Sequence, residues 1–129
     1  MDELLKFKEK LSVRELSYAI YRKALNLSLT GNRDADSYYE ESIRMALSSR
    51  DTSVAVHVLR NYADALAHFS VRNYKKSNEL IKRVFQISPQ FKLLPHCYIT
   101  LVQNHLNLQQ IDSAQYYFNI AREKERLQQ

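Results

Sequence analysis

The chain has 129 residues, a formal net charge of +5, one cysteine, one glycine and two prolines. So little glycine and proline provides few turns for a β-rich fold, and the many helix-forming residues predict an all-α fold. A single cysteine excludes an internal disulfide, and no apolar run reaches the roughly 20 residues that span a bilayer.

The first long helix is expected to begin near Val13. Ser12 followed three residues later by Glu15 is a capping-box pattern, which satisfies free backbone groups at a helix start. Gly31, the only glycine, can adopt the left-handed conformation that often follows a helix end. Before this helix, apolar residues among lysines at positions 4–11 predict a short capping helix or a disordered leader.

Polar caps and prolines mark the other helix boundaries. The second helix is expected over about 34–49, and the third to about Val71. The remaining signals are Asp51 or Thr52 for the third helix, Asn73 and Pro89 for the fourth, Pro95 for the fifth, and Asp112 with Gln115 for the sixth. These boundaries predict one domain of three helical hairpins, at about 12–50, 52–88 and 91–127.

A pattern of aromatic, small and large apolar residues recurs in each predicted hairpin. Its members are Tyr21, Ala24, Leu25, Tyr39, Ile43 and Ala46; Tyr62, Ala65, Leu66, Phe69, Ser77, Ile81 and Val84; and Tyr98, Leu101, Val102, His105, Ala114, Phe118 and Ala121. This spacing resembles the tetratricopeptide repeat. The distance along the chain between the first tyrosines of successive copies is longer than the roughly 34 residues of that family. The resemblance implies a tetratricopeptide-like α-α superhelix acting as a protein or peptide interaction module.

The resemblance also implies a concave groove lined by the first helix of each hairpin. Matched position by position, the lining residues are Arg22, Asn26, Arg60, Ala67, His96, Gln103 and Asn107. Guanidinium and amide groups suit peptide recognition, because they pair with carboxylates and backbone carbonyls at defined geometry. Ordinary solvated helix faces are an equal alternative for these residues.

Positive charge is concentrated between Ala65 and Ile111, where the excess of basic residues equals the net charge of the chain. A predicted basic outer face consists of Arg72, Lys75, Lys76, Lys82 and Arg83. An amphipathic helix needs a charged solvent-facing side, so a solvated face is the favoured interpretation. Single-stranded nucleic-acid binding by a helical repeat is the alternative function, although the polar positions that would read bases do not recur between copies.

No pattern predicts catalysis, a cofactor or a metal site. The four histidines form no pair with one another or with the cysteine at helical spacing, and no phosphate-binding glycine loop is present. We therefore expect a non-enzymatic chain that binds a protein or peptide partner.

The last predicted helix carries more apolar surface than one packed face uses, including Tyr116, Phe118 and Ile120. We expect a fragment of a longer array, or a homodimer through this C-terminal helix. Similar expanded repeats occur in sensor portions of bacterial regulators, which implies a regulatory or scaffold role. A cytoplasmic location is expected, or a periplasmic one if the chain belongs to a membrane-anchored regulator.

Overall fold

The computed structural model describes residues 11–69 and 71–128, and the all-α fold is confirmed. No strand occurs among these residues. The helices are α2 (Val13–Leu29), α3 (Ala35–Ser48), α4 (Thr52–His68), α5 (Tyr74–Ile87), α6 (Pro95–Asn107) and α7 (Ile111–Leu127), with a short 3₁₀ helix, η2 (Pro89–Leu93). The capping helix or leader expected at residues 4–11 lies almost wholly outside the described residues.

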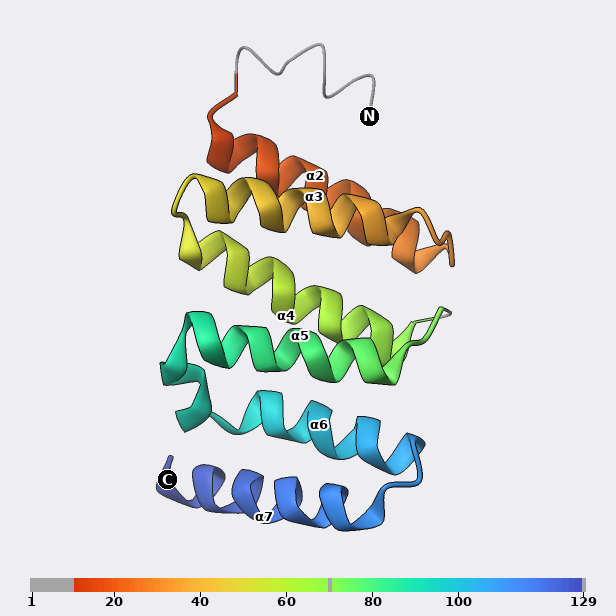
Figure 1. Ribbon diagram of the computed structural model, residues 1–129, viewed down its shortest axis with the longest axis vertical. Helices are drawn as coiled ribbons and strands as arrows, with labels where there is room; N and C mark the ends of the chain where they lie inside the picture. The colour runs from red at the N-terminus through yellow and green to blue at the C-terminus, as the bar shows by residue number, and fades with distance from the viewer. Residues whose placement is uncertain (1–10, 70, 129) are drawn as a thin grey trace.

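Consecutive helices pair as antiparallel hairpins: α2 with α3, α4 with α5, and α6 with α7 (Figure 1). The three hairpins follow one another along the long axis of the molecule in chain order. Helix α3 contacts α4, α5 contacts α6, and α4 also contacts both α2 and α6. Helix α4 is therefore the central element. It contacts α2 and α3 of the first hairpin and α6 of the third.

The start and end of α2 follow the predicted local chemistry. The Glu15 amide donates to Ser12 Oγ at 3.1 Å, and the Ser12 amide donates to Glu15 Oε1 at 3.2 Å, so the capping box is formed. Gly31 has a φ of 74°, the left-handed conformation that glycine adopts without a steric penalty. Asp51 and Asn73 likewise cap α4 and α5 by accepting backbone N–H bonds.

Two predicted boundaries are wrong. Helix α4 ends at His68 instead of continuing to Val71, because Phe69 is extended and the Asn73 amide donates to the Leu66 carbonyl at 2.9 Å. Helix α7 begins at Ile111 without a side-chain cap, so Asp112 and Gln115 form no capping box there.

The turn before α7 is closed by the backbone. Gln109 has a φ of 60°, and the Gln110 amide donates to the His105 carbonyl at 2.8 Å. This is the Schellman arrangement, which satisfies the last carbonyls of the preceding helix. Arg50 provides the same left-handed residue between α3 and α4, with a φ of 61°. Neither residue is a glycine, which explains why the sequence pattern did not identify these turns.

The recurring apolar positions form the core. All of them are buried or half-buried except Phe118. The bulky Tyr39 occupies the position at which the other two copies have the small residues Ser77 and Ala114, and its ring stacks on Tyr62 with the centroids 4.3 Å apart. The Tyr62 hydroxyl donates to Asp36 Oδ1 at 2.8 Å, while Tyr39 Oη accepts from Ser28 at 3.0 Å. The first two hairpins are thus joined by stacked, hydrogen-bonded tyrosines.

Candidate binding groove

Two neighbouring cavities lie along α4. The first, of about 600 Å³, lies between α2 and α4 and is lined by Leu11, Arg14, Glu15, Tyr18, Ala19, Ser53, Val54 and His57. The second, of about 410 Å³, lies between α4 and η2 and is lined by Thr52, Ser53, Val56, His57, Arg60, Ser88, Gln90 and Phe91. Because Ser53 and His57 line both, the cavities adjoin. We call these two adjoining cavities together the α4 groove.

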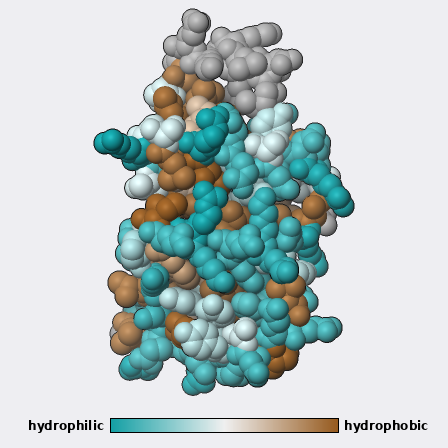
Figure 2. Space-filling view, in the orientation of Figure 1, coloured by the Kyte–Doolittle hydropathy of each residue, from teal (hydrophilic) through white to brown (hydrophobic). Residues whose placement is uncertain are grey.

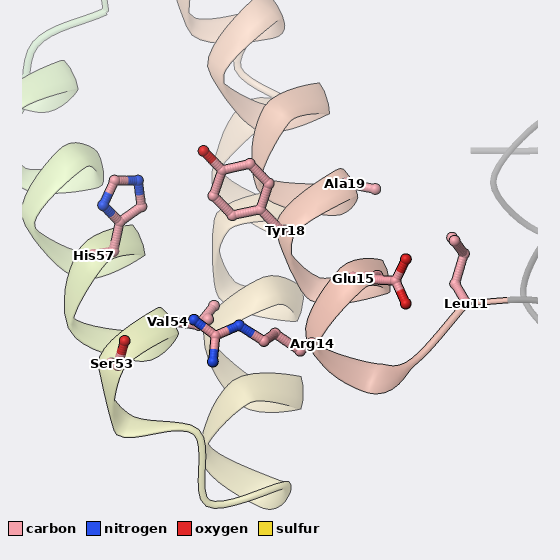
Figure 3. A pocket seen from close by; sticks show the side chains of 8 residues that line it. All are labelled: Leu11, Arg14, Glu15, Tyr18, Ala19, Ser53, Val54 and His57. Atoms are coloured by element: carbon pink, nitrogen blue, oxygen red, sulfur yellow. The ribbon is translucent and has the colours of Figure 1, made fainter.

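Aromatic side chains form the wall of the first cavity. The Tyr18 ring stacks on His57 with the centroids 5.9 Å apart, and Tyr21 meets the same imidazole edge-on at 5.3 Å. Figure 3 shows Tyr18 and Arg14 extending from α2 toward His57, Ser53 and Val54 of α4. Tyr18 is 44% exposed, so much of its surface is available for contact. Hydrophobic colour also gathers over the region of α2 to α4 in Figure 2.

The charged side chains that line the groove are Arg14 and Glu15 in the first cavity and Arg60 in the second. Partial burial lowers the pKa of His57, and the nearby Arg60 lowers that pKa further. The Arg60 guanidinium carbon lies 4.8 Å from the centre of the Phe91 ring, a cation-π geometry. Burial also raises the pKa of the Cys97 thiol, although the adjacent Arg60 opposes that rise. A buried, protonated thiol is a poor nucleophile.

Arg60 is the only one of the seven predicted groove residues that lines either cavity. Arg22 and Asn26 are exposed on α2, outside the α4 groove. The prediction that Ala67 lines a groove is wrong. Its side chain packs inside the molecule and is only 7% exposed.

The predicted residues on α6 connect it to α4. His96 Nε2 lies 3.4 Å from Asp64 Oδ2, and His68 Nε2 lies 3.0 Å from Gln103 Oε1. Asn107 donates to the backbone carbonyl of Gln103 at 2.9 Å. These side chains are on the surface, but His96 and Gln103 contact α4, Asn107 contacts its own helix, and none of them lines either cavity.

The sequence pattern did not single out Tyr18, Ser53, His57 or Phe91. Tyr18 lies three residues before the core position Tyr21, which places it on an adjacent helix face. This spacing indicates proximity to the core, but the hollow depends on the separation of α2 and α4. No local signal reports that separation.

The predicted basic outer face is divided. Lys75 and Lys82 are exposed on α5, whereas Lys76 Nζ and Arg83 Nη1 lie 3.8 and 3.9 Å from Glu40 carboxylate oxygens on α3. Arg72 precedes α5, and its Nε donates to the Phe69 carbonyl at 3.3 Å. The prediction of one outward stripe is therefore corrected: half-buried Lys76 and Arg83 join the first hairpin to the second.

Helix α7 has several exposed apolar residues: Ile111, Tyr116, Phe118 and Leu127. Its buried residues are Ala114 and Ala121, which face the remainder of the fold.

Within residues 11–69 and 71–128, no three His, Cys, Asp or Glu side chains are grouped to hold a metal ion. Over the same residues, no helix combines the length and apolarity needed to cross a membrane.

Comparison of the chain with protein-family models, curated proteins and solved structures finds no match.

Proposed function

We propose that the chain is a non-catalytic interaction module that binds an extended peptide segment of a partner protein in the α4 groove. The observation that carries this proposal is the pair of adjoining cavities, of about 600 and 410 Å³, formed by α2, α4 and η2. Each volume lies within the roughly 300–1,000 Å³ typical of ligand sites. Two such hollows in series fit alternate side chains of one extended segment, because residues i and i+2 share a face.

The chemistry of the groove supports a peptide as the occupant. Tyr18 offers a rigid, amphipathic contact surface, which is common at protein interaction sites. Ser53 and Gln90 supply groups that can hydrogen-bond to a peptide backbone. The residues predicted for a nucleic-acid-binding basic face do not line either cavity, so these observations favour a peptide over nucleic acid.

We also propose that the module is tetratricopeptide-like and belongs to the sensor or assembly part of a larger bacterial regulator. The row of three antiparallel hairpins and the burial of the recurring positions support this assignment. The exposed apolar residues of α7 support a homodimer formed through the C-terminal helix, because apolar surface on an end hairpin is stabilised when a second surface covers it.

The peptide-binding proposal is tested by selecting binders from a library of short random peptides and measuring their affinity by fluorescence anisotropy. Tyr18→Ala is expected to weaken selected peptides about tenfold or more, since truncating a central interface tyrosine commonly costs over 1 kcal/mol. Gln103→Ala is the matched control on the α4–α6 surface and is expected to leave affinity unchanged. A library without binders, or binders insensitive to Tyr18→Ala, contradicts the proposal.

A further inference from the structure

Arg60 occupies an unusual position in the second cavity of the α4 groove. It is half-buried on α4, with its guanidinium over the Phe91 ring of η2 and beside the Cys97 thiol of α6. Contacts from three elements therefore hold the cation in one place. A guanidinium held this way loses little further side-chain freedom when it binds a ligand.

The Arg60 guanidinium is not paired with an oxygen atom among residues 11–69 and 71–128. Arg60 forms neither a hydrogen bond to oxygen nor an ion pair there, and its Nε is buried without a partner. Arg83, the other half-buried arginine, has Glu40 at 3.9 Å. A buried donor without an acceptor is unfavourable, so an anion that accepts from Arg60 Nε would satisfy this group.

The surrounding groups are suited to an anion. Thr52, Ser53 and Gln90 contribute hydrogen-bond donors to the cavity lining, and no Asp or Glu lines it. Thr52 and Ser53 are also in the first turn of α4, where the helix dipole favours negative charge. Partial burial, and to a smaller extent Arg60, lowers the pKa of the adjoining His57, which adds no acidic group to the lining.

The acids on and next to α4 are engaged elsewhere. Asp51 accepts from the Val54 amide at 3.1 Å and lies 3.4 Å from Arg14. Asp64 lies 3.4 Å from His96 and accepts from Thr100 at the same distance. Neither carboxylate forms an ion pair with Arg60, so among the described residues no acid is paired with this cation.

We propose that the cavity at Arg60 binds a carboxylate group of the partner peptide, either an acidic side chain or the C-terminal carboxylate. This inference rests on the proposed function and adds the chemical class of the group recognised. One arginine matches the single charge of a carboxylate, and the planar guanidinium fork matches its two oxygens. An apolar side chain of the same peptide would then occupy the neighbouring cavity at Tyr18.

The first experiment needs no peptide. Acetate is titrated into the full chain at constant ionic strength, and the arginine Nε–Hε cross-peaks are followed by NMR. Arg122 is the matched control, because its guanidinium also lies over an aromatic ring, Phe118, at 5.7 Å, but is exposed. We expect a saturable shift of the Arg60 signal and none for Arg122. Equal responses overturn the proposal, and so does tighter binding of inorganic phosphate than of acetate.

The second experiment uses the peptides selected from the random library. Arg60→Met is expected to weaken them about 10- to 100-fold, and Arg60→Lys, which keeps the charge without the fork, to weaken them less. Thermal unfolding of each variant checks that it is folded. Amidation of the C-terminus and Glu→Gln substitution in the peptide identify which carboxylate is bound.

The two proposals fail separately. Acetate binding at Arg60 without any selected peptide supports the carboxylate site and contradicts the peptide-binding function. Selected peptides whose affinity is unaffected by Arg60→Met, by amidation and by Glu→Gln overturn the carboxylate site while the peptide-binding function stands.

Discussion

One position of the repeating pattern is buried in the first two hairpins and exposed in the third. Ile43 on α3 is 1% exposed and Ile81 on α5 is 2% exposed, whereas Phe118 on α7 is 45% exposed. Helices α4 and α6 follow and contact α3 and α5, but no helix among the described residues lies beyond α7. Burial at this position is therefore decided by the next hairpin, because a helical hairpin cannot cover both of its own faces.

The largest effect is expected at the covered surface between the first two hairpins. Tyr62→Ala removes a fully buried ring that stacks on Tyr39, and should lower the free energy of unfolding by about 3–5 kcal/mol, as for other buried aromatic truncations. Tyr62→Phe keeps the ring and loses the hydrogen bond to Asp36, so a loss of about 0.5–1.5 kcal/mol is expected. Urea unfolding measures both values. Equal losses would mean that packing does not join these hairpins.

The second prediction compares equivalent positions directly. Ile81→Ala should lower the free energy of unfolding by about 2–5 kcal/mol, because it leaves a cavity between α5 and the neighbouring helices. Phe118→Ala should cost about 1 kcal/mol or less in the monomer, since nearly half of that side chain is already in water. Chemical unfolding at low protein concentration provides the comparison. A larger cost at Phe118 than at Ile81 would contradict the role of the next hairpin.

A third prediction concerns the uncovered surface of α7. If a second copy covers Phe118, the chain should show a mass that rises with concentration, and Phe118→Glu should return it to the monomer mass. The folding stability of that monomer should change by only about 0.5 kcal/mol, as is usual for a surface substitution. Sedimentation equilibrium measures the masses. A wild-type chain that stays monomeric at high concentration excludes the homodimer.

The smallest effect is expected from His57, beside the covered surface between the first two hairpins. Its pKa is lowered in the folded chain, so below its unfolded value of about 6.5 the unfolded chain binds the proton more readily. The contribution of neutral His57 to the free energy of unfolding is therefore complete above pH 6.5 and decreases as the pH falls toward the lowered pKa. His57→Gln should reduce this pH dependence in thermal unfolding. An unchanged slope would assign the dependence to other groups.

Much of the fold was predictable because the signals are local. Ser12, Asp51 and Asn73 cap the helices that they were expected to cap, and the recurring apolar positions form the core. Turns that rely on left-handed residues other than glycine were not predictable in this way. Arg50 and Gln109 carry no strong preference for that conformation, so the surrounding backbone hydrogen bonds decide it.

The candidate site was predictable only in part. Arg60 was expected at a groove and lines one, but His96 and Gln103 were expected there too and instead contact α4. An exposed polar residue at the correct helical spacing can face a hollow or bridge to a neighbouring helix. The choice depends on how closely the two helices approach, and residue spacing within one helix does not encode that distance.

By itself, the amino-acid sequence determined the helical class of the chain, most helix boundaries and the identity of the core residues, because capping groups and the 3.6-residue period act within one helix. The tertiary structure alone decided that Tyr18 and His57 border a hollow, that Arg60 has no oxygen partner among the described residues, and that Phe118 is exposed. These features depend on the separation and order of whole helices, which arise only when the hairpins pack together.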